Sequence, residues 1–277
     1  MKKPQWLTLA AGVCLLAALF YFGKTIPPKK TTTTISAGSE TSISIDSLIR
    51  NAKKSLTAAQ LDNLNGLEHS VVRGDVKEQQ IKVNRELAMF WRDSVNMPEI
   101  SLWYLAEAAR LENSEKSLTF AGHQFLDNLI AENAPQIKQW EAFQAKDLFE
   151  RSLILNPTND SSKIGLGSVY IFGGITSPMQ GILMVREVAD KDSTNEYAQT
   201  TLGIASLMSG QLDKAIERFK RIAALKPGNA QAVYRVASLY EQMGNKQEAK
   251  KWYTRLLPLL RNQETKSIEN KIAELSK

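Results

Sequence analysis

The chain has 277 residues, of which 43% are hydrophobic, enough for one sizeable repeat array or two small domains. Its formal charge of +6 is unevenly placed: five lysines and one acid precede residue 46, and the rest carries 30 basic and 28 acidic side chains. Nucleic-acid-binding proteins concentrate lysine and arginine on one face, and no such stripe is visible, so we expect no nucleic-acid partner. The only cysteine, Cys14, lies in an apolar run, which excludes a disulfide framework or a thiolate zinc site elsewhere in the chain.

An uncharged apolar run from residue 6 to residue 22 follows a short basic tail, residues 1–5. At about 1.5 Å per helical residue this run spans roughly 26 Å, near the lower limit for crossing a bilayer. Trp6 and Tyr21 stand near its two ends, where aromatic side chains favour membrane interfaces. A cleaved signal peptide is the alternative, but the bulky residues and Lys24 that follow do not resemble its small-residue cleavage site. We therefore expect residues 6–22 to form an uncleaved transmembrane helix.

The segments that flank the apolar run indicate its orientation. A very short basic tail is easily retained in the cytoplasm, whereas a long domain translocates largely regardless of charge. We expect the tail in the cytoplasm and the C-terminal domain in the periplasm, with the protein in the inner membrane of a bacterium. Residues 23–45 contain adjacent prolines, a threonine run and few apolar side chains, a composition that does not order itself. This segment is predicted to be a flexible tether.

Beyond the tether the apolar spacing becomes helical and remains so to the end, with no β-rich segment. Residues 46–113 are predicted to form degenerate N-terminal helical repeats, including a long helix over 76–95 and another that begins at Pro98. A first hairpin helix is expected over 117–130, followed by a connection, ENAPQIKQW, that is longer than a regular turn. Residues 261–277 are predicted to form a charged helix that caps the array.

The most informative stretch runs from Glu196 to Leu257, where one unit occurs twice with an offset of 34 residues. Small residues recur where two helices would cross, and an aromatic residue recurs further along. The matched positions are Leu202, Gly203, Gly210, Ala215 and Phe219 in the first copy and Val236, Ala237, Gly244, Ala249 and Tyr253 in the second. Two less regular units precede this stretch, with Ala145, Phe149 and Pro157 in one and Gly167, Tyr170, Gly181 and Val185 in the other. The turn of the latter unit, FGGITSPM, is about two residues longer than in the regular copies.

Over residues 114–260 this pattern resembles the tetratricopeptide repeat family, with roughly four hairpins. The resemblance implies an all-α, right-handed stack of helical hairpins, an α-solenoid, that binds proteins or peptides. With its apolar run and tether, the chain resembles bacterial single-pass membrane-anchored members of this family. In the family, partner peptides usually lie in a concave groove lined by the first helix of each hairpin. The corresponding residues here are Ile164, Ser168 and Ile171; Tyr197, Thr200, Ile204 and Leu207; and Tyr234, Arg235, Ser238 and Glu241.

These residue types predict an apolar groove with two tyrosines, suited to a hydrophobic peptide or an amphipathic helix. Family members that clamp a C-terminal carboxylate use paired lysine and asparagine at groove positions. The equivalent positions here hold Thr200, Ile204, Tyr234 and Ser238. A carboxylate clamp is therefore not expected. Two interpretations stay open: the side chains bind a partner, or they pack against a neighbouring helix of the same chain.

No constellation of catalytic or metal-binding residues is recognisable. His69 and His123 are 54 residues apart, and neither has an acid or a thiol at ligand spacing. We therefore expect no enzyme, no cofactor, no metal and no small-molecule substrate. The expected function is a scaffold or assembly factor for an envelope complex. One alternative is a periplasmic chaperone-like factor for unfolded or secreted clients, of the secretion or cytochrome-maturation type. Another is a degenerate catalytic helical domain, which would need a cleft with perturbed ionisable groups.

Overall fold

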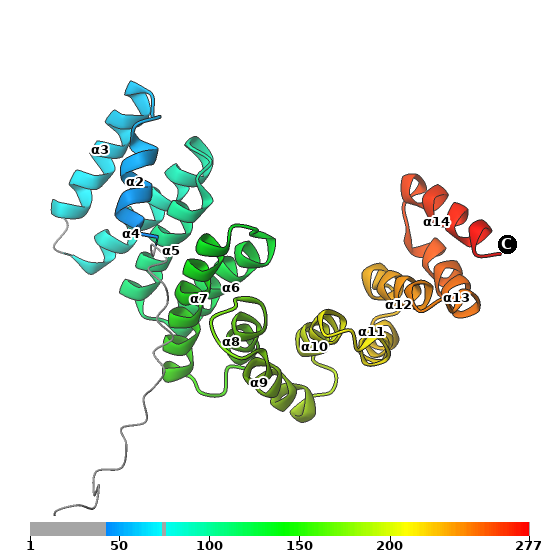
Figure 1. Ribbon diagram of the computed structural model, residues 1–277. Coiled ribbons are helices and arrows are strands. Elements are labelled where there is room, and N and C mark those ends of the chain that lie inside the picture. Colours follow the sequence, from blue (N-terminus) through cyan, green and yellow to red (C-terminus); the bar gives the residue numbers. More distant parts are fainter. Residues whose placement is uncertain (1–42, 74–75, 277) are drawn as a thin grey trace, which may run out of the picture. The chain divides into compact units, whose positions relative to one another are not determined.

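The computed structural model describes residues 43–73 and 76–276, which contain helices and no strand (Figure 1). The predicted cytoplasmic tail, the predicted transmembrane helix and nearly all of the predicted tether fall in residues 1–42, outside the described residues. Within the described ranges, no helix is both long enough and apolar enough to cross a membrane.

The described part of the chain contains five consecutive helical hairpins, each formed by two helices adjacent in sequence. They are α4 (Lys77–Met89) with α5 (Pro98–Glu112), α6 (Glu115–Ala131) with α7 (Pro135–Leu155), α8 (Asp160–Phe172) with α9 (Pro178–Lys191), α10 (Glu196–Met208) with α11 (Leu212–Leu225), and α12 (Ala230–Gln242) with α13 (Lys246–Leu256). The remaining elements are α2 (Ile45–Lys53), α3 (Ala58–Arg73), the π-helical segment η1 (Phe90–Ser94), the 3-10 turn η2 (Leu257–Leu259) and α14 (Asn262–Glu274). The prediction of an all-α stack of hairpins is confirmed for this part of the chain.

The connection between α6 and α7 was expected to be long, and this expectation is wrong. Helix α6 ends at Ala131 and α7 already begins at Pro135, so most of the ENAPQIKQW segment is helical. Pro135 stands in the first turn of α7. Proline has no backbone N–H, and the N–H groups of a first turn have no partner within the helix, so proline costs no hydrogen bond there. The proline starts the helix here. In contrast, the turn between α8 and α9 is two residues longer than those of the next two hairpins, as predicted.

Residues that recur every 34 positions define the ends of the helices in the regular hairpins. The Oδ1 atoms of Asn195 and Asn229 each accept a hydrogen bond of 3.0 Å from the backbone N–H three residues later, which caps α10 and α12. Gly210 and Gly244 follow these helices at φ +71° and +74°. Glycine occupies this left-handed region without steric cost, so the sequence period reflects backbone geometry.

Glycines on the first helices make room for aromatic rings from the second helices. The ring of Phe219 on α11 is buried against Gly203 on α10, where an added Cβ would stand 2.9 Å from the ring. The buried ring of Phe149 on α7 lies in the same way against Gly122 and Gly165. These contacts confirm the predicted role of small residues where helices cross, since any side chain there would push the helices apart.

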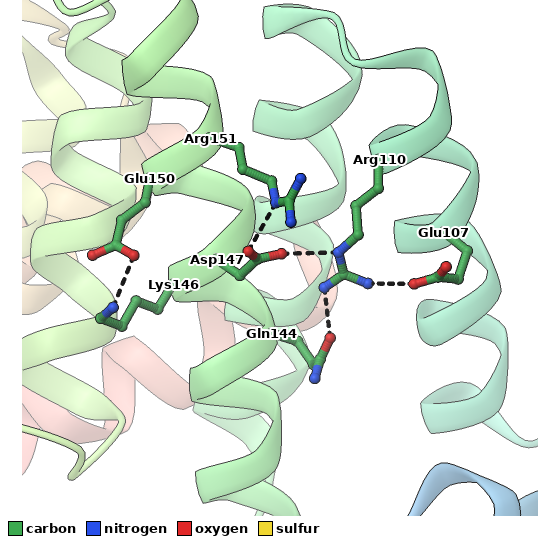
Figure 2. A network of polar contacts seen from close by, with 7 residues as sticks. All are labelled: Glu107, Arg110, Gln144, Lys146, Asp147, Glu150 and Arg151. Carbon is green, nitrogen blue, oxygen red and sulfur yellow. Dashed lines mark hydrogen bonds and ion pairs between the residues drawn. The ribbon is translucent and has the colours of Figure 1, made fainter.

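Polar contacts of Arg110 on α5 join neighbouring hairpins (Figure 2). Its guanidinium donates to Asp147 at 2.8 Å and to Gln144 at 2.7 Å, both on α7, and to Glu107 of its own helix at 2.7 Å. Arg151 donates to the other oxygen of Asp147 at 2.8 Å. Burial raises the pKa of Asp147, but the hydrogen bonds from Arg151 and Arg110 outweigh burial and hold this pKa below its usual value. The network therefore connects α5 to α7 through charged hydrogen bonds.

Candidate protein-interaction surface

The first set of predicted groove residues, on α8, lies inside the protein. Ile164, Ser168 and Ile171 are 1%, 1% and 7% exposed. The two isoleucines belong to a buried cluster that includes Val185 on α9 and Leu202 on α10. These three residues do not line an open groove, because side chains of the same chain cover them.

Tyr197 on α10 also packs within the chain. Its ring lies 5.5 Å from the ring of His123 on α6, and its hydroxyl is buried. Burial raises the pKa of Tyr197 to about 12. The interpretation of internal packing therefore holds for this tyrosine.

His123 belongs to the same packed region. Its ring lies 5.0 Å from that of Phe149, and Nε2 lies 2.9 Å from the Ser161 hydroxyl. Burial lowers the pKa of His123, while the Asp127 carboxylate acts in the opposite direction. Residues 43–73 and 76–276 contain no group of three His, Cys, Asp or Glu side chains that could hold a metal ion. The contacts of His123 are those of a residue at the edge of the core.

An open hollow lies further along the chain, between α10 and α12. It encloses ≈ 270 Å³, and we call it the α10–α12 hollow. Its lining residues are Leu207, Phe219, Gln231, Tyr234, Arg235, Ser238, Leu239 and Gln242. Four of them are predicted groove residues: Leu207, Tyr234, Arg235 and Ser238. The Arg235 guanidinium lies 5.4 Å from the centre of the Phe219 ring, a cation–π distance that holds the cation at the hollow's wall.

A second hollow, of ≈ 460 Å³, lies between α12, the end of α13 and α14; we call it the α12–α14 hollow. Its lining residues are Ala230, Gln231, Tyr234, Leu256, Leu259, Leu260, Arg261, Glu264, Ser267 and Ile268. Tyr234 and Gln231 line both hollows. The Tyr234 ring is 41% exposed and lies 6.1 Å from the buried Tyr253 ring, edge to face. Tyr234 is thus a supported aromatic side chain between two cavities.

Glu241, another predicted groove residue, is engaged within the chain. Its carboxylate accepts a hydrogen bond of 2.5 Å from the Tyr253 hydroxyl and two of 3.1 Å from Lys271 on α14. The hydrogen bond from Tyr253, followed by those from Lys271, lowers the pKa of Glu241 despite burial. Lys271 also lies 5.7 Å from the Tyr253 ring. Glu241 therefore attaches α14 to the last hairpin, and a partner would have to compete with Lys271 for it.

The two remaining predicted residues, Thr200 and Ile204, are half-buried on α10. Ile204 packs with Leu207 against the buried cluster formed by α11, α12 and α13. Neither residue lines the α10–α12 hollow. Sequence reasoning missed the lining residues that come from other elements: Phe219 of α11, Leu256, Leu259 and Leu260 in and around η2, and Ile268 of α14. The apolar Leu256–Leu260 run beside a charged helix was the one available signal.

The helices and hollows described above define a helical-hairpin repeat protein with an exposed aromatic surface near its last hairpin. The model of the tetratricopeptide repeat family matches residues 184–271, which contain both hollows. Residues 184–271 therefore match the tetratricopeptide repeat family, as the sequence pattern indicated. Proteins of this kind are generally modules for protein interaction rather than enzymes.

Several solved structures resemble this chain at low sequence identity. MamA (residues 41 to the end) from Desulfovibrio magneticus RS-1 is 22% identical, over 67% of this chain and 96% of that chain, with a TM-score of 0.47. YrrB, described as a TPR protein with an unusual peptide-binding site, is 18% identical, over 74% and 97%, with a TM-score of 0.45. PilW, described as a type IV pilus biogenesis factor, is 17% identical, over 72% and 86%, with a TM-score of 0.50. No curated protein matches this chain.

Proposed function

We propose that this protein binds a partner protein at the two hollows on either side of Tyr234, as a scaffold or assembly factor for an envelope complex. The observation that carries the proposal is the exposed side chain of Tyr234, which lies between two cavities and packs edge to face against the Tyr253 ring. Tyrosine and arginine are enriched among the side chains that dominate binding energy at interfaces. Tyr234 and Arg235 provide both beside an apolar wall.

The lining of the hollows favours an apolar segment as the ligand. Leu256, Leu259, Leu260 and Ile268 supply apolar contacts on one side of Tyr234. Gln231, Ser238 and Gln242 supply polar groups on the other side. An amphipathic helix or a short hydrophobic peptide can place apolar side chains in both cavities while its polar face stays in water. The ligand we propose is a segment of that kind.

The proposal includes anchoring in the inner membrane by residues 6–22, with the repeats in the periplasm. Its support is the uncharged apolar run with flanking lysines and aromatic residues. A flexible tether over residues 23–45 would give a root-mean-square reach of roughly 25 Å from the membrane. Alkaline phosphatase fused after residue 277 should be active in a bacterial host if the repeats are periplasmic. An inactive full-length fusion, or activity that persists after removal of residues 1–22, would contradict the proposed anchor.

Photocrosslinking from position 234 tests the binding surface. The full-length protein would carry benzoylphenylalanine in place of Tyr234, with the exposed Lys250 on α13 as the matched control position. We expect one or two stoichiometric envelope proteins that are captured from position 234 and not from position 250. Capture of a broad set of unfolded or secreted clients would favour the chaperone-like alternative over the scaffold hypothesis. Identical products from both positions would refute the binding surface.

A further inference from the structure

A separate hollow of ≈ 370 Å³ lies between α9, α10 and α11, on the other side of α10 from the predicted groove. Its lining residues are Met179, Ile182, Arg186, Leu202, Ala205, Ser206, Ser209, Gln211, Lys214, Glu217 and Arg218. With 3.6 residues per turn, the α10 lining positions 202, 205, 206 and 209 face away from the groove positions 200, 204 and 207. The hollow is therefore independent of the surface around Tyr234.

The rim of this hollow carries an excess of positive charge. Arg186, Lys214 and Arg218 line it, against the single acid Glu217. The Glu217 side chain is 69% exposed and already forms an ion pair of 3.6 Å with Arg221. Arg186 forms no hydrogen bond or ion pair with the described residues. Three cations therefore line the hollow with one carboxylate, which is shared with Arg221.

Two of the cations are held in place by other side chains. Arg218 donates to Gln199 Oε1 at 2.8 Å, and the fully buried Gln199 donates in turn to the Ser193 carbonyl at 3.0 Å. This uses one guanidinium nitrogen and leaves the others free to bind an acceptor. Lys214 donates to Gln211 Oε1 at 2.7 Å. Burial, followed by the nearby Arg221, lowers the pKa of Arg218, while Glu217 and Asp190 act in the opposite direction.

The floor of the hollow is apolar. Leu202 and Ala205 of α10 are nearly buried beneath it, and Ile182 and Met179 of α9 form one wall. Met179 is 58% exposed and so presents a large apolar surface. Methionine adapts its shape to irregular ligands. A bare inorganic anion would satisfy the rim but leave this floor uncovered.

We propose that the α9–α11 hollow binds an acidic peptide segment of a partner protein that carries a hydrophobic side chain between its carboxylates. The carboxylates would bind Arg186, Arg218 and Lys214, since guanidinium groups bind carboxylates through paired hydrogen bonds. The hydrophobic side chain would lie on Leu202 and Ala205, against Met179. This is a second interaction surface, and its acidic ligand differs in chemistry from the apolar or amphipathic segment proposed near Tyr234.

Three fluorescent peptides with leucines at identical positions test the proposal, the intervening residues being all glutamate, all glutamine or all lysine. Fluorescence anisotropy with the full-length protein in mild detergent would measure their affinities. We expect the glutamate peptide to bind most tightly and the lysine peptide least, with a difference that shrinks as salt is added. Equal binding of all three peptides, or displacement of the glutamate peptide by equimolar inorganic phosphate, would overturn the proposal.

Charge variants locate the binding. Arg186→Glu with Lys214→Glu changes two exposed side chains and should lower the affinity for the glutamate peptide by about tenfold or more. Lys246→Glu with Lys250→Glu, exposed on α13, makes the same change of net charge and should leave the affinity unchanged. Glu217→Gln should tighten binding about threefold, because it removes the only acid of the rim. A gain of affinity cannot result from misfolding. Unchanged affinity in both rim variants would refute the site.

Discussion

Glu141 tests how strongly burial in this fold disfavours a charged side chain. Its side chain on α7 is fully buried; Oε1 accepts a hydrogen bond from Asn128 of α6, and Oε2 has no partner among the described residues. The pKa of Glu141 is raised from 4.5 to about 7, chiefly by burial; the Asn128 hydrogen bond and Lys138 act against the rise, and Glu132 and Glu99 add to it. The carboxyl is therefore protonated in the folded protein at a pH where the unfolded chain has already lost the proton.

The sign and size of the effect follow from this difference. Between about pH 4.5 and pH 7 the folded state binds the proton that the unfolded state has released, so the stability contributed by Glu141 falls as pH rises. At about 1.4 kcal/mol for each pKa unit, the difference corresponds to roughly 3 kcal/mol lost between pH 4.5 and pH 8. Glu141→Gln is neutral at every pH and removes this dependence.

Urea unfolding at several pH values between 5 and 8 measures the prediction, with circular dichroism as the signal. The free energy of unfolding of the native protein should fall relative to that of Glu141→Gln by about 2–3 kcal/mol across this range. Glu269→Gln, an exposed change on α14, controls for the removal of one carboxylate. A carbon NMR titration of Glu141 gives its pKa directly. A difference between the native protein and Glu141→Gln that does not change with pH would refute the reasoning.

Two further predictions concern packing and the polar network. Gly165→Ala should destabilise the protein by about 1–2 kcal/mol, because its Cβ would overlap the buried Phe149 ring; Gly66→Ala, whose Cβ meets nothing within 4 Å, should raise stability by up to about 1 kcal/mol. Equal thermal shifts for the two would contradict the packing argument. Arg110→Ala should cost about 1–3 kcal/mol, because it removes the bonds from α5 to Asp147 and Gln144. Lys146→Ala, which breaks a surface pair with Glu150, should cost less than about 0.5 kcal/mol in the same unfolding assay, and a similar loss in both would show that the α5–α7 network adds no stability.

Much of the fold could be predicted from the sequence, because the geometry of each repeat is set by residues that are close together in the chain. The 34-residue period placed Gly210 and Gly244 in the turns and Gly203 beneath Phe219, where the backbone and the helix crossing require them. The connection before α7 was misread because proline ends a helix in most contexts and starts one in the first turn. Whether a proline ends or starts a helix depends on the residues that follow it, and Gln136 to Gln139 alone did not distinguish the two cases.

The candidate surface could be predicted only in part, because a groove stays open only where no other side chain of the protein occupies it. Of the groove positions expected from the sequence, Leu207, Tyr234, Arg235 and Ser238 line the α10–α12 hollow. The same rule assigned Ile164, Ser168 and Ile171 to the groove, yet side chains of α9 and α10 bury them. Helical period fixes the direction in which a side chain points, but not how close the next helix comes.

By itself, the sequence determined the helical hairpins, their period, their caps and the residue types that face outward. The tertiary structure alone decided that Tyr234 stays open between two cavities, that Glu241 is taken by Lys271, and that Glu141 is buried. It also brought Arg186 of α9 to the same hollow as Lys214 and Arg218 of α11. The reason is physical: propensity and period act over a few residues, whereas burial and charge are set by segments that meet only after the hairpins have packed.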